Sequence, residues 1–84
     1  GGFYVDSAKG IIIARSLNSD FLAVSSICTH QGSTIEYQAN ANRFFCAAHG
    51  SAFDTAGTAT VGPATTALKK YKTTLTGTNL RVYA

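Results

Sequence analysis

The 84-residue chain contains two cysteines and two histidines, and all four lie in two short segments of similar construction. One residue separates Cys28 from His30, and two residues separate Cys46 from His49. A glycine follows each histidine within two positions, and 15 residues lie between the two segments. Glycine tolerates the positive φ of a tight loop and lets backbone N–H groups point at an anionic centre. The pattern predicts two facing loops that offer two thiolates and two imidazoles to one site.

This ligand set indicates a particular chemistry. Thiolates suit soft metals and iron–sulfur clusters, and imidazoles suit zinc, copper and iron. With one ligand of each kind per loop, the four ligands can be sorted over two metals. A [2Fe-2S] cluster with two cysteines on one iron and two histidines on the other is easier to reduce than a four-cysteine cluster, because neutral ligands replace anionic ones. Such centres have potentials of about −150 to +300 mV, against about −400 mV for plant-type ferredoxins.

Two simpler readings use the same residues. In a small exported domain, Cys28 and Cys46 would form a structural disulfide. A closed zinc site of two cysteines and two histidines is the other alternative. The matched histidines favour a metal centre over the disulfide, and the spacing and trailing glycines differ from those of a helix-borne zinc finger. Either alternative would make the chain a non-redox secreted β-module.

The segments Cys28-Thr29-His30-Gln31-Gly32 and Cys46-Ala47-Ala48-His49-Gly50-Ser51 resemble the two cluster-binding loops of the Rieske iron–sulfur family. The hairpin over residues 11–27 and the Gly62-Pro63-Ala64 segment resemble the strand pair and the proline loop of that fold. The resemblance implies one Rieske domain over residues 1–84, with cluster-binding loops at about 28–33 and 46–51. The family has more sequence before the first hairpin, which allows for a truncated N-terminus.

The resemblance also implies a role for each site residue. Cys28 and Cys46 would hold the inner iron of a [2Fe-2S] cluster, and His30 and His49 would hold the outer iron. In relatives from the quinol-oxidising complexes, a serine at the position of Ser51 donates a hydrogen bond to a bridging sulfide. Such a donor stabilises the reduced cluster and raises its potential.

Other positions depart from the quinol-oxidising subgroup. Ser33 and Ala48 stand where that subgroup has a further cysteine in each loop, so its loop-clamping disulfide cannot form here. Phe53 stands where the subgroup has a tyrosine that donates to a cysteine sulfur. The Ser51 hydrogen-bond donor is kept and the tyrosine donor is lost. We therefore expect a reduction potential between the ferredoxin-like and quinol-oxidising extremes, below about +250 mV.

The elements that must position these loops are predicted to be strands. Hydrophobic residues make up 45% of the chain and charged residues 13%, a composition that folds. β-branched and aromatic runs alternate with turn residues, and no apolar run has helical spacing. Strands are predicted at residues 3–5, 11–15, 21–27, 34–37, 43–45, 52–54, 59–61, 71–75 and 80–82, with a short turn at 39–42. The sequence therefore predicts an all-β antiparallel sandwich or barrel with a cluster-binding subdomain.

Two expectations concern individual side chains. In the last hairpin, Tyr71, Thr73 and Leu75 alternate onto one face. Tyr71, Phe44 and Phe45 are predicted to belong to the core rather than to a docking surface.

Charge and hydropathy exclude several functions. The net charge of +3 comes mostly from the lysines at 69, 70 and 72, which predict a solvated face rather than a nucleic-acid site. No run of 18 apolar residues is present, so membrane attachment would need a segment outside this sequence. Low charge and Ser51 favour an extracytoplasmic setting over a cytoplasmic one.

The number of histidines restricts the chemistry further. A mononuclear oxygenase iron or a hydrolytic general base would each need a histidine beyond the two already used. We therefore expect no catalytic centre in this chain, and one-electron transfer between a donor and an acceptor protein. The chain would be a carrier or an electron-transfer subunit of a larger oxidoreductase. The alternative is a ferredoxin component that supplies a Rieske-type oxygenase.

Overall fold

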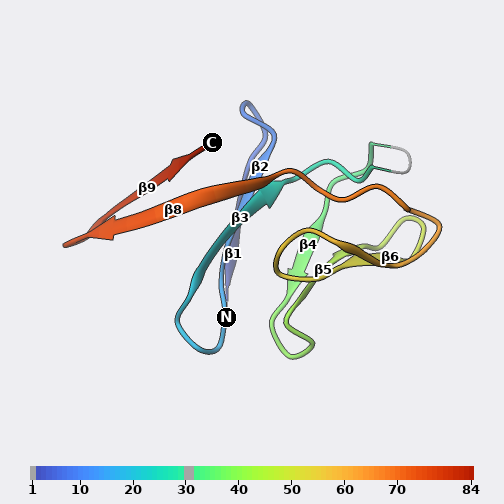
Figure 1. The fold of residues 1–84 in the computed structure, drawn as a ribbon, viewed down its shortest axis with the longest axis horizontal. Helices are drawn as coiled ribbons and strands as arrows, with labels where there is room; N and C mark the ends of the chain where they lie inside the picture. The colour runs from blue at the N-terminus through green and yellow to red at the C-terminus, as the bar shows by residue number, and fades with distance from the viewer. Residues whose placement is uncertain (1, 30–31) are drawn as a thin grey trace.

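Two antiparallel sheets make up the computed structural model, which describes residues 2–29 and 32–84 (Figure 1). Within these ranges the chain forms strands and no helix, so the predicted all-β fold is confirmed. The first sheet has the strand order β1-β2-β3-β8-β9, and the second has the order β4-β5-β6-β7. The strands are β1 (Phe3–Asp6), β2 (Ile11–Arg15), β3 (Phe21–Ser25), β4 (Glu36–Gln38), β5 (Arg43–Cys46), β6 (Ser51–Phe53), β7 (Ala59–Val61), β8 (Lys70–Thr76) and β9 (Asn79–Tyr83).

The core lies between the two sheets. Ile12 and Val24, which are partners in the β2–β3 register, face the second sheet from the first and are fully buried. Phe44 and Phe53, which are partners in the β5–β6 register, are fully buried on the other side. The same cluster of buried side chains includes both cysteines. The residues predicted to do chemistry are therefore packed as part of the core.

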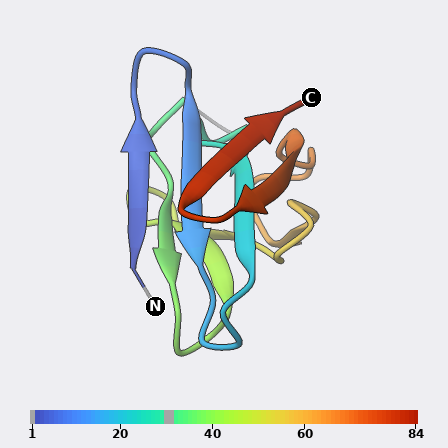
Figure 2. The same cartoon turned by 90° about the vertical axis from the view of Figure 1, so that its left-hand side faces the viewer.

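The β8–β9 hairpin leaves the first sheet soon after joining it. β8 pairs with β3 only at Ala23 and Val24, and the hairpin then crosses the outer face of β2 and β3 (Figure 2). Leu80 and Val82 line a hollow of about 220 Å³ there, together with residues of β1 and β2. This crossing covers part of the face that points away from the second sheet.

The ends of several strands differ from the sequence prediction. β3 ends at Ser25 rather than at residue 27. The Ser26 N–H still donates to the Gly10 carbonyl, but the Ser26 carbonyl accepts the N–H of Ile35, which leads into the second sheet. Ile27 then makes an isolated bridge with Thr34, and β4 begins at Glu36 rather than at residue 34. The chain passes from one sheet to the other at this point.

The predicted core is confirmed at Phe44 and only partly at two other aromatic residues. Phe45 and Tyr71 are half-buried, with Arg43 and Lys69 lying over their rings at 5.0 Å from each centroid. A cation above the ring keeps that face partly accessible to water. Leu75, which continues the Tyr71 face, is 52% exposed because the hairpin tip extends beyond the sheet.

Tyr37 closes the turn between β4 and β5. Its hydroxyl donates to the Asn42 side-chain oxygen at 2.6 Å, and Asn42 has a positive φ of 49°. The Asn42 N–H donates to the Ala39 carbonyl, so the short turn predicted at residues 39–42 is confirmed. Burial raises the pKa of the Tyr37 hydroxyl, because the charged phenolate would be poorly solvated there.

A change of Tyr37 to Phe should alter how stability depends on pH. The unfolded tyrosine ionises near pH 10, and the folded one ionises at higher pH. The Tyr37 contribution to stability is therefore complete below about pH 10 and is lost as the pH rises through the folded pKa. Tyr37→Phe should remove this loss, which denaturant unfolding at pH 8 to 11 would measure. Identical slopes for wild type and Tyr37→Phe would contradict this account.

Gly57 is a second position with a testable constraint. Its φ is +87°, and a Cβ there would lie 2.6 Å from the Leu68 carbonyl oxygen. Gly77 also has a positive φ, of +59°, but a Cβ there would meet nothing within 4 Å. Both alanine variants should lose about 1–2 kcal/mol to backbone strain. Gly57→Ala should lose about 1–3 kcal/mol more, because the backbone of Leu68 must move. Thermal unfolding of the two variants measures the difference, and equal losses would show that the contact does not matter.

Candidate metal centre

The first cysteine loop begins where the chain leaves β3. The Cys28 N–H donates to the Ser33 carbonyl at 2.7 Å, and the Gly32 N–H donates back to the Cys28 carbonyl at 2.9 Å. Gly32 has a φ of +75°, which supplies the positive φ predicted for the residue that ends this loop. His30, the predicted ligand between them, lies outside the described residues.

The second loop joins β5 to β6 and repeats this construction. Cys46 ends β5, and Ser51, its partner in the register, begins β6. The Gly50 N–H donates to the Cys46 carbonyl at 2.8 Å, and Gly50 has a φ of +76°. In each loop the cysteine carbonyl thus accepts from a glycine four residues later. The two loops therefore share this hydrogen bond and a glycine at positive φ.

The described ligand candidates differ in burial. Cys28 and Cys46 are 2% and 0% exposed, belong to one buried cluster, and are both free thiols. The alternative of a Cys28–Cys46 disulfide is therefore not realised in this structure. His49 is exposed at its loop. The candidate sulfur ligands lie inside the protein and the candidate imidazole ligand lies at the surface, an order that fits a cluster with one inner and one outer iron.

A site for one metal ion is less well matched. Within residues 2–29 and 32–84, no three His, Cys, Asp or Glu side chains form a group that could hold a single ion. A closed zinc site would gather Cys28, Cys46 and His49 around one point. These three residues do not form such a group in the part of the chain that the structure describes.

Ser51 lies fully buried beside the second loop. Its Oγ accepts the Ala64 N–H at 3.0 Å, which leaves the hydroxyl proton itself free to be donated. No acceptor for that proton is found among the residues that the structure describes. Ser51 therefore fits a donor to an anionic group beside it. Phe53, two residues later, is fully buried in the core and brings no hydroxyl.

Sequence analysis singled out Gly62-Pro63-Ala64 as a proline loop but missed Thr29 and the residues at 65–68 that follow this loop. The Thr29 hydroxyl donates to the Thr66 carbonyl at 2.7 Å, across 37 residues of sequence. In Figure 1 this segment, drawn in orange, passes the cysteine loops before β8 begins. An isolated threonine in a loop carries no sequence signal of such a contact.

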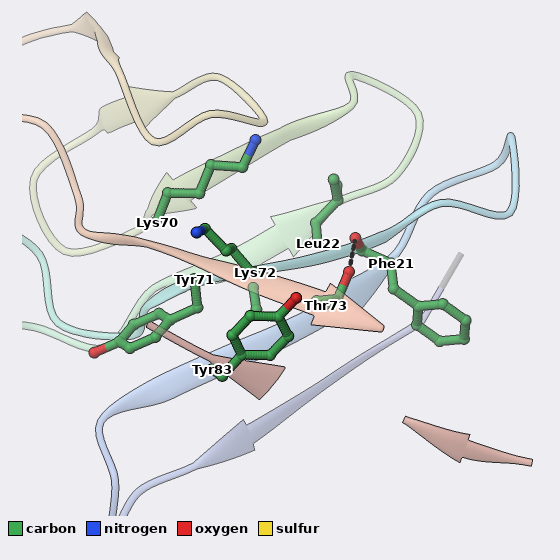
Figure 3. A pocket seen from close by; sticks show the side chains of 8 residues that line it. Phe21, Leu22, Lys70, Tyr71, Lys72, Thr73 and Tyr83 are labelled. Atoms are coloured by element: carbon green, nitrogen blue, oxygen red, sulfur yellow. Dashed lines mark hydrogen bonds between the residues drawn. The ribbon is translucent and has the colours of Figure 1, made fainter. Parts of the chain in front are cut away.

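A separate groove of about 580 Å³ lies on the first sheet (Figure 3). Phe21, Tyr71, Lys72 and Tyr83 are among the residues that line it, and Thr73 donates its hydroxyl to the Phe21 carbonyl there. Cys28, Cys46 and His49 do not line this groove, so it is distinct from the described part of the candidate centre.

Among the described residues, the chain has no helix with the length and hydropathy needed to cross a bilayer.

Comparisons with known proteins agree with this arrangement. The sequence is 44% identical over 41 residues to the cytochrome b6-f complex iron-sulfur subunit of Synechococcus sp. (strain RCC307), which is 49% of this chain and 23% of that protein. It is 36% identical over 53 residues to the corresponding subunit of Synechococcus elongatus, which is 63% of this chain and 29% of that protein. The chain thus spans less than a third of the length of these relatives.

Two solved structures have the same fold. The plasma membrane Rieske protein PetC3 from Synechocystis PCC 6803 superposes with a TM-score of 0.72 at 28% identity, over 92% of this chain and 89% of that one. The ferredoxin of carbazole 1,9a-dioxygenase from Nocardioides aromaticivorans IC177 superposes with a TM-score of 0.78 at 22% identity, over 87% and 73%. The family model of the Rieske [2Fe-2S] domain matches residues 3–72. This chain, with its paired cysteine loops and its two antiparallel sheets, belongs to the Rieske [2Fe-2S] domain family.

Proposed function

We propose that this chain transfers one electron at a time through a [2Fe-2S] cluster bound by its two cysteine loops. Cys28 and Cys46 are assigned to the inner iron, and His30 and His49 to the outer iron. The observation that carries this proposal is the order of burial: two free thiols lie in the core, and His49 lies at the surface of a matching loop. An electron can enter or leave through the exposed imidazole without opening the core.

The residues around the thiols set the energetics of the site. When bound, the cluster accepts and releases one electron. Buried thiols are poor places for uncompensated negative charge, so Cys28 and Cys46 need the positive charge of iron to remain as thiolates. Two neutral imidazoles in place of two thiolates lower the total negative charge and make reduction easier. We assign to Ser51 the donation of its free hydroxyl proton to a cluster sulfide, which favours the reduced state.

We assign residues 1–84 to one electron-transfer domain without a catalytic centre of its own. Both histidines of the chain are used by the cluster, so none remains for a second metal or a general base. Donor and acceptor proteins would approach beside His49, where Ala47 and Ala48 are exposed and uncharged. Contact there would depend on shape and apolar area more than on ion pairs.

The relatives favour one setting. The sequence matches are iron-sulfur subunits of the cytochrome b6-f complex, which supports an electron-transfer subunit of a larger oxidoreductase. A ferredoxin that supplies an oxygenase is the second candidate, supported by the fold shared with the carbazole dioxygenase ferredoxin. A carrier reduced by a nicotinamide-linked reductase needs a low reduction potential, whereas a carrier reduced by quinol needs a high one.

We expect a measured reduction potential between about −150 and +250 mV.

Reconstitution with iron and sulfide tests the ligand assignment. The wild-type chain should bind two irons and two sulfides and give the EPR signal of one unpaired electron after reduction. Cys28→Ser, Cys46→Ser, His30→Ala and His49→Ala should each lose the cluster, because each removes one iron ligand. Ala48→Ser, an exposed neighbour of His49, is the control and should keep it. A wild-type chain that binds zinc and no sulfide would overturn the proposal, as would a full cluster in His49→Ala.

Replacing Ser51 by Ala tests the donor. The variant should keep its cluster and have a lower potential. Loss of a hydrogen bond to a charged group is worth about 1.5–3 kcal/mol, which corresponds to at most roughly 65–130 mV for a one-electron couple.

Ser16→Ala is the matched control for Ser51→Ala. Ser16 is also buried, and its Oγ also accepts a backbone N–H, from Asp20, but it lies in the β2–β3 turn. This variant should leave the potential unchanged. Equal potentials for wild type and Ser51→Ala, measured by voltammetry, would remove Ser51 from the site.

A further inference from the structure

The groove on the first sheet lies where β3 and β8 stop pairing. The register between these two strands ends at Ala23 and Tyr71, although β8 continues to Thr76. The groove, of about 580 Å³, is lined by consecutive residues of both strands, at 21–23 and 70–73. Successive side chains of a strand point to opposite faces, so a groove lined by consecutive residues follows the gap between two backbones. The groove is therefore an opening in the sheet rather than a hollow on one face.

Backbone groups of β3 face this opening. The Ser25 N–H donates to the Lys69 carbonyl, so Ser25 directs its backbone groups toward the chain of β8. Alternate residues of a strand point their N–H and C=O groups the same way, which directs those of Ala23 and Phe21 toward β8 as well. The Phe21 carbonyl accepts the Thr73 hydroxyl at 3.2 Å, a side chain where a continuous ladder would supply a backbone N–H. The opening therefore presents strand backbone with which another extended chain could pair.

The side chains around the opening combine cations with aromatic rings (Figure 3). Lys70 and Lys72 are exposed and alternate onto one side of β8, and Tyr71 and Tyr83 line the groove with half-buried rings. No aspartate or glutamate is among the described residues that line it, and no other described residue forms an ion pair with either lysine. Two cations at alternate positions of a strand match two carboxylates at alternate positions of a partner strand. Charge and spacing together indicate an acidic, extended partner.

We propose that this groove binds an extended acidic segment of a partner protein, with the segment's backbone against β3 and β8 and its carboxylates on Lys70 and Lys72. Alternate side chains of the segment would lie against the rings of Tyr71 and Tyr83. In strand addition of this kind, main-chain hydrogen bonds give affinity and alternate side chains give specificity.

The groove is separate from the described ligand candidates, because Cys28, Cys46 and His49 do not line it. A short segment bound in the groove does not occupy the surface of His49. The same chain can therefore hold a partner at the groove and exchange an electron at the cysteine loops. The inference goes beyond the proposed function and stands without it, since the groove belongs to the folded chain.

A short, fluorescently labelled peptide in which glutamate and valine alternate tests the groove, with fluorescence anisotropy as the readout. Its glutamates would meet the two lysines, and its valines would meet the aromatic rings. Lys70→Gln and Lys72→Gln should each raise the Kd of this peptide, because each removes one partner of an exposed ion pair. One such pair corresponds to roughly a 1.4- to 5-fold change in Kd, so the double variant should bind roughly 2- to 25-fold more weakly.

Lys9→Gln is the matched control. Lys9 is also an exposed lysine, but it lies in the turn between β1 and β2 and does not line this groove. This variant loses the same charge as Lys72→Gln and should keep the wild-type Kd. Equal weakening by the two variants would reduce the effect to net charge and overturn the proposal.

Three further measurements identify the occupant. The same peptide with alternate amides N-methylated should bind more weakly, because those amides can no longer donate to a neighbouring strand, and equal binding would refute strand addition. Unlabelled oligothymidylate that displaces the peptide at a lower concentration than unlabelled peptide does would assign the groove to nucleic acid. A dimer in size-exclusion chromatography that Lys72→Gln dissociates would assign it to a second copy of this chain. Either of these last two results would overturn the proposal.

Discussion

The burial of two free thiols between two loops is the constraint on which the rest of the structure depends. Cys28 and Cys46 lie in the same apolar cluster as Phe44 and Phe53, so the packing of the core also fixes where the two thiols lie. Each thiol must stay inside while the loop that carries it turns back toward the surface. Glycines at positive φ, four residues after each cysteine, allow that turn. The result is sulfur on the inside and an exposed His49 at the surface.

Each of the two sheets positions one part of this candidate centre. The second sheet holds Cys46 and Ser51 as partners in the β5–β6 register, so strand pairing sets the distance between this candidate ligand and the buried hydroxyl. Cys28 lies three residues after the end of β3, a strand of the first sheet. Residues 62–68 run from the end of β7 toward the start of β8. On the way, the Thr66 carbonyl accepts the Thr29 hydroxyl and the Ala64 N–H donates to the Ser51 Oγ.

Much of the fold can be predicted from local sequence because strands and tight turns leave local patterns. A continuous run of apolar residues marks β2, and alternating residues mark β8. The turn at residues 39–42 needs only Asn42 and its neighbours. The side chains that depend on distant partners were harder to predict. Leu75 shares a face with Tyr71 but is exposed, since the pairing of β8 with β3 stops after two residues. Phe45 and Tyr71 are only half-buried, and a cation two residues before each of them, Arg43 or Lys69, lies over its ring.

The sequence by itself determined the chemistry of the candidate centre: which ligands are present, how they are divided between two loops, and which glycines let the loops turn. These are properties of residue type and short spacing, which act over a few bonds. Only the tertiary structure decided which candidate ligands are buried and which distant residues the two loops contact. Thr29 meets Thr66 across 37 residues, and Ser51 meets Ala64 across 13. Such contacts depend on where the core places two backbones, and no spacing in the chain encodes them.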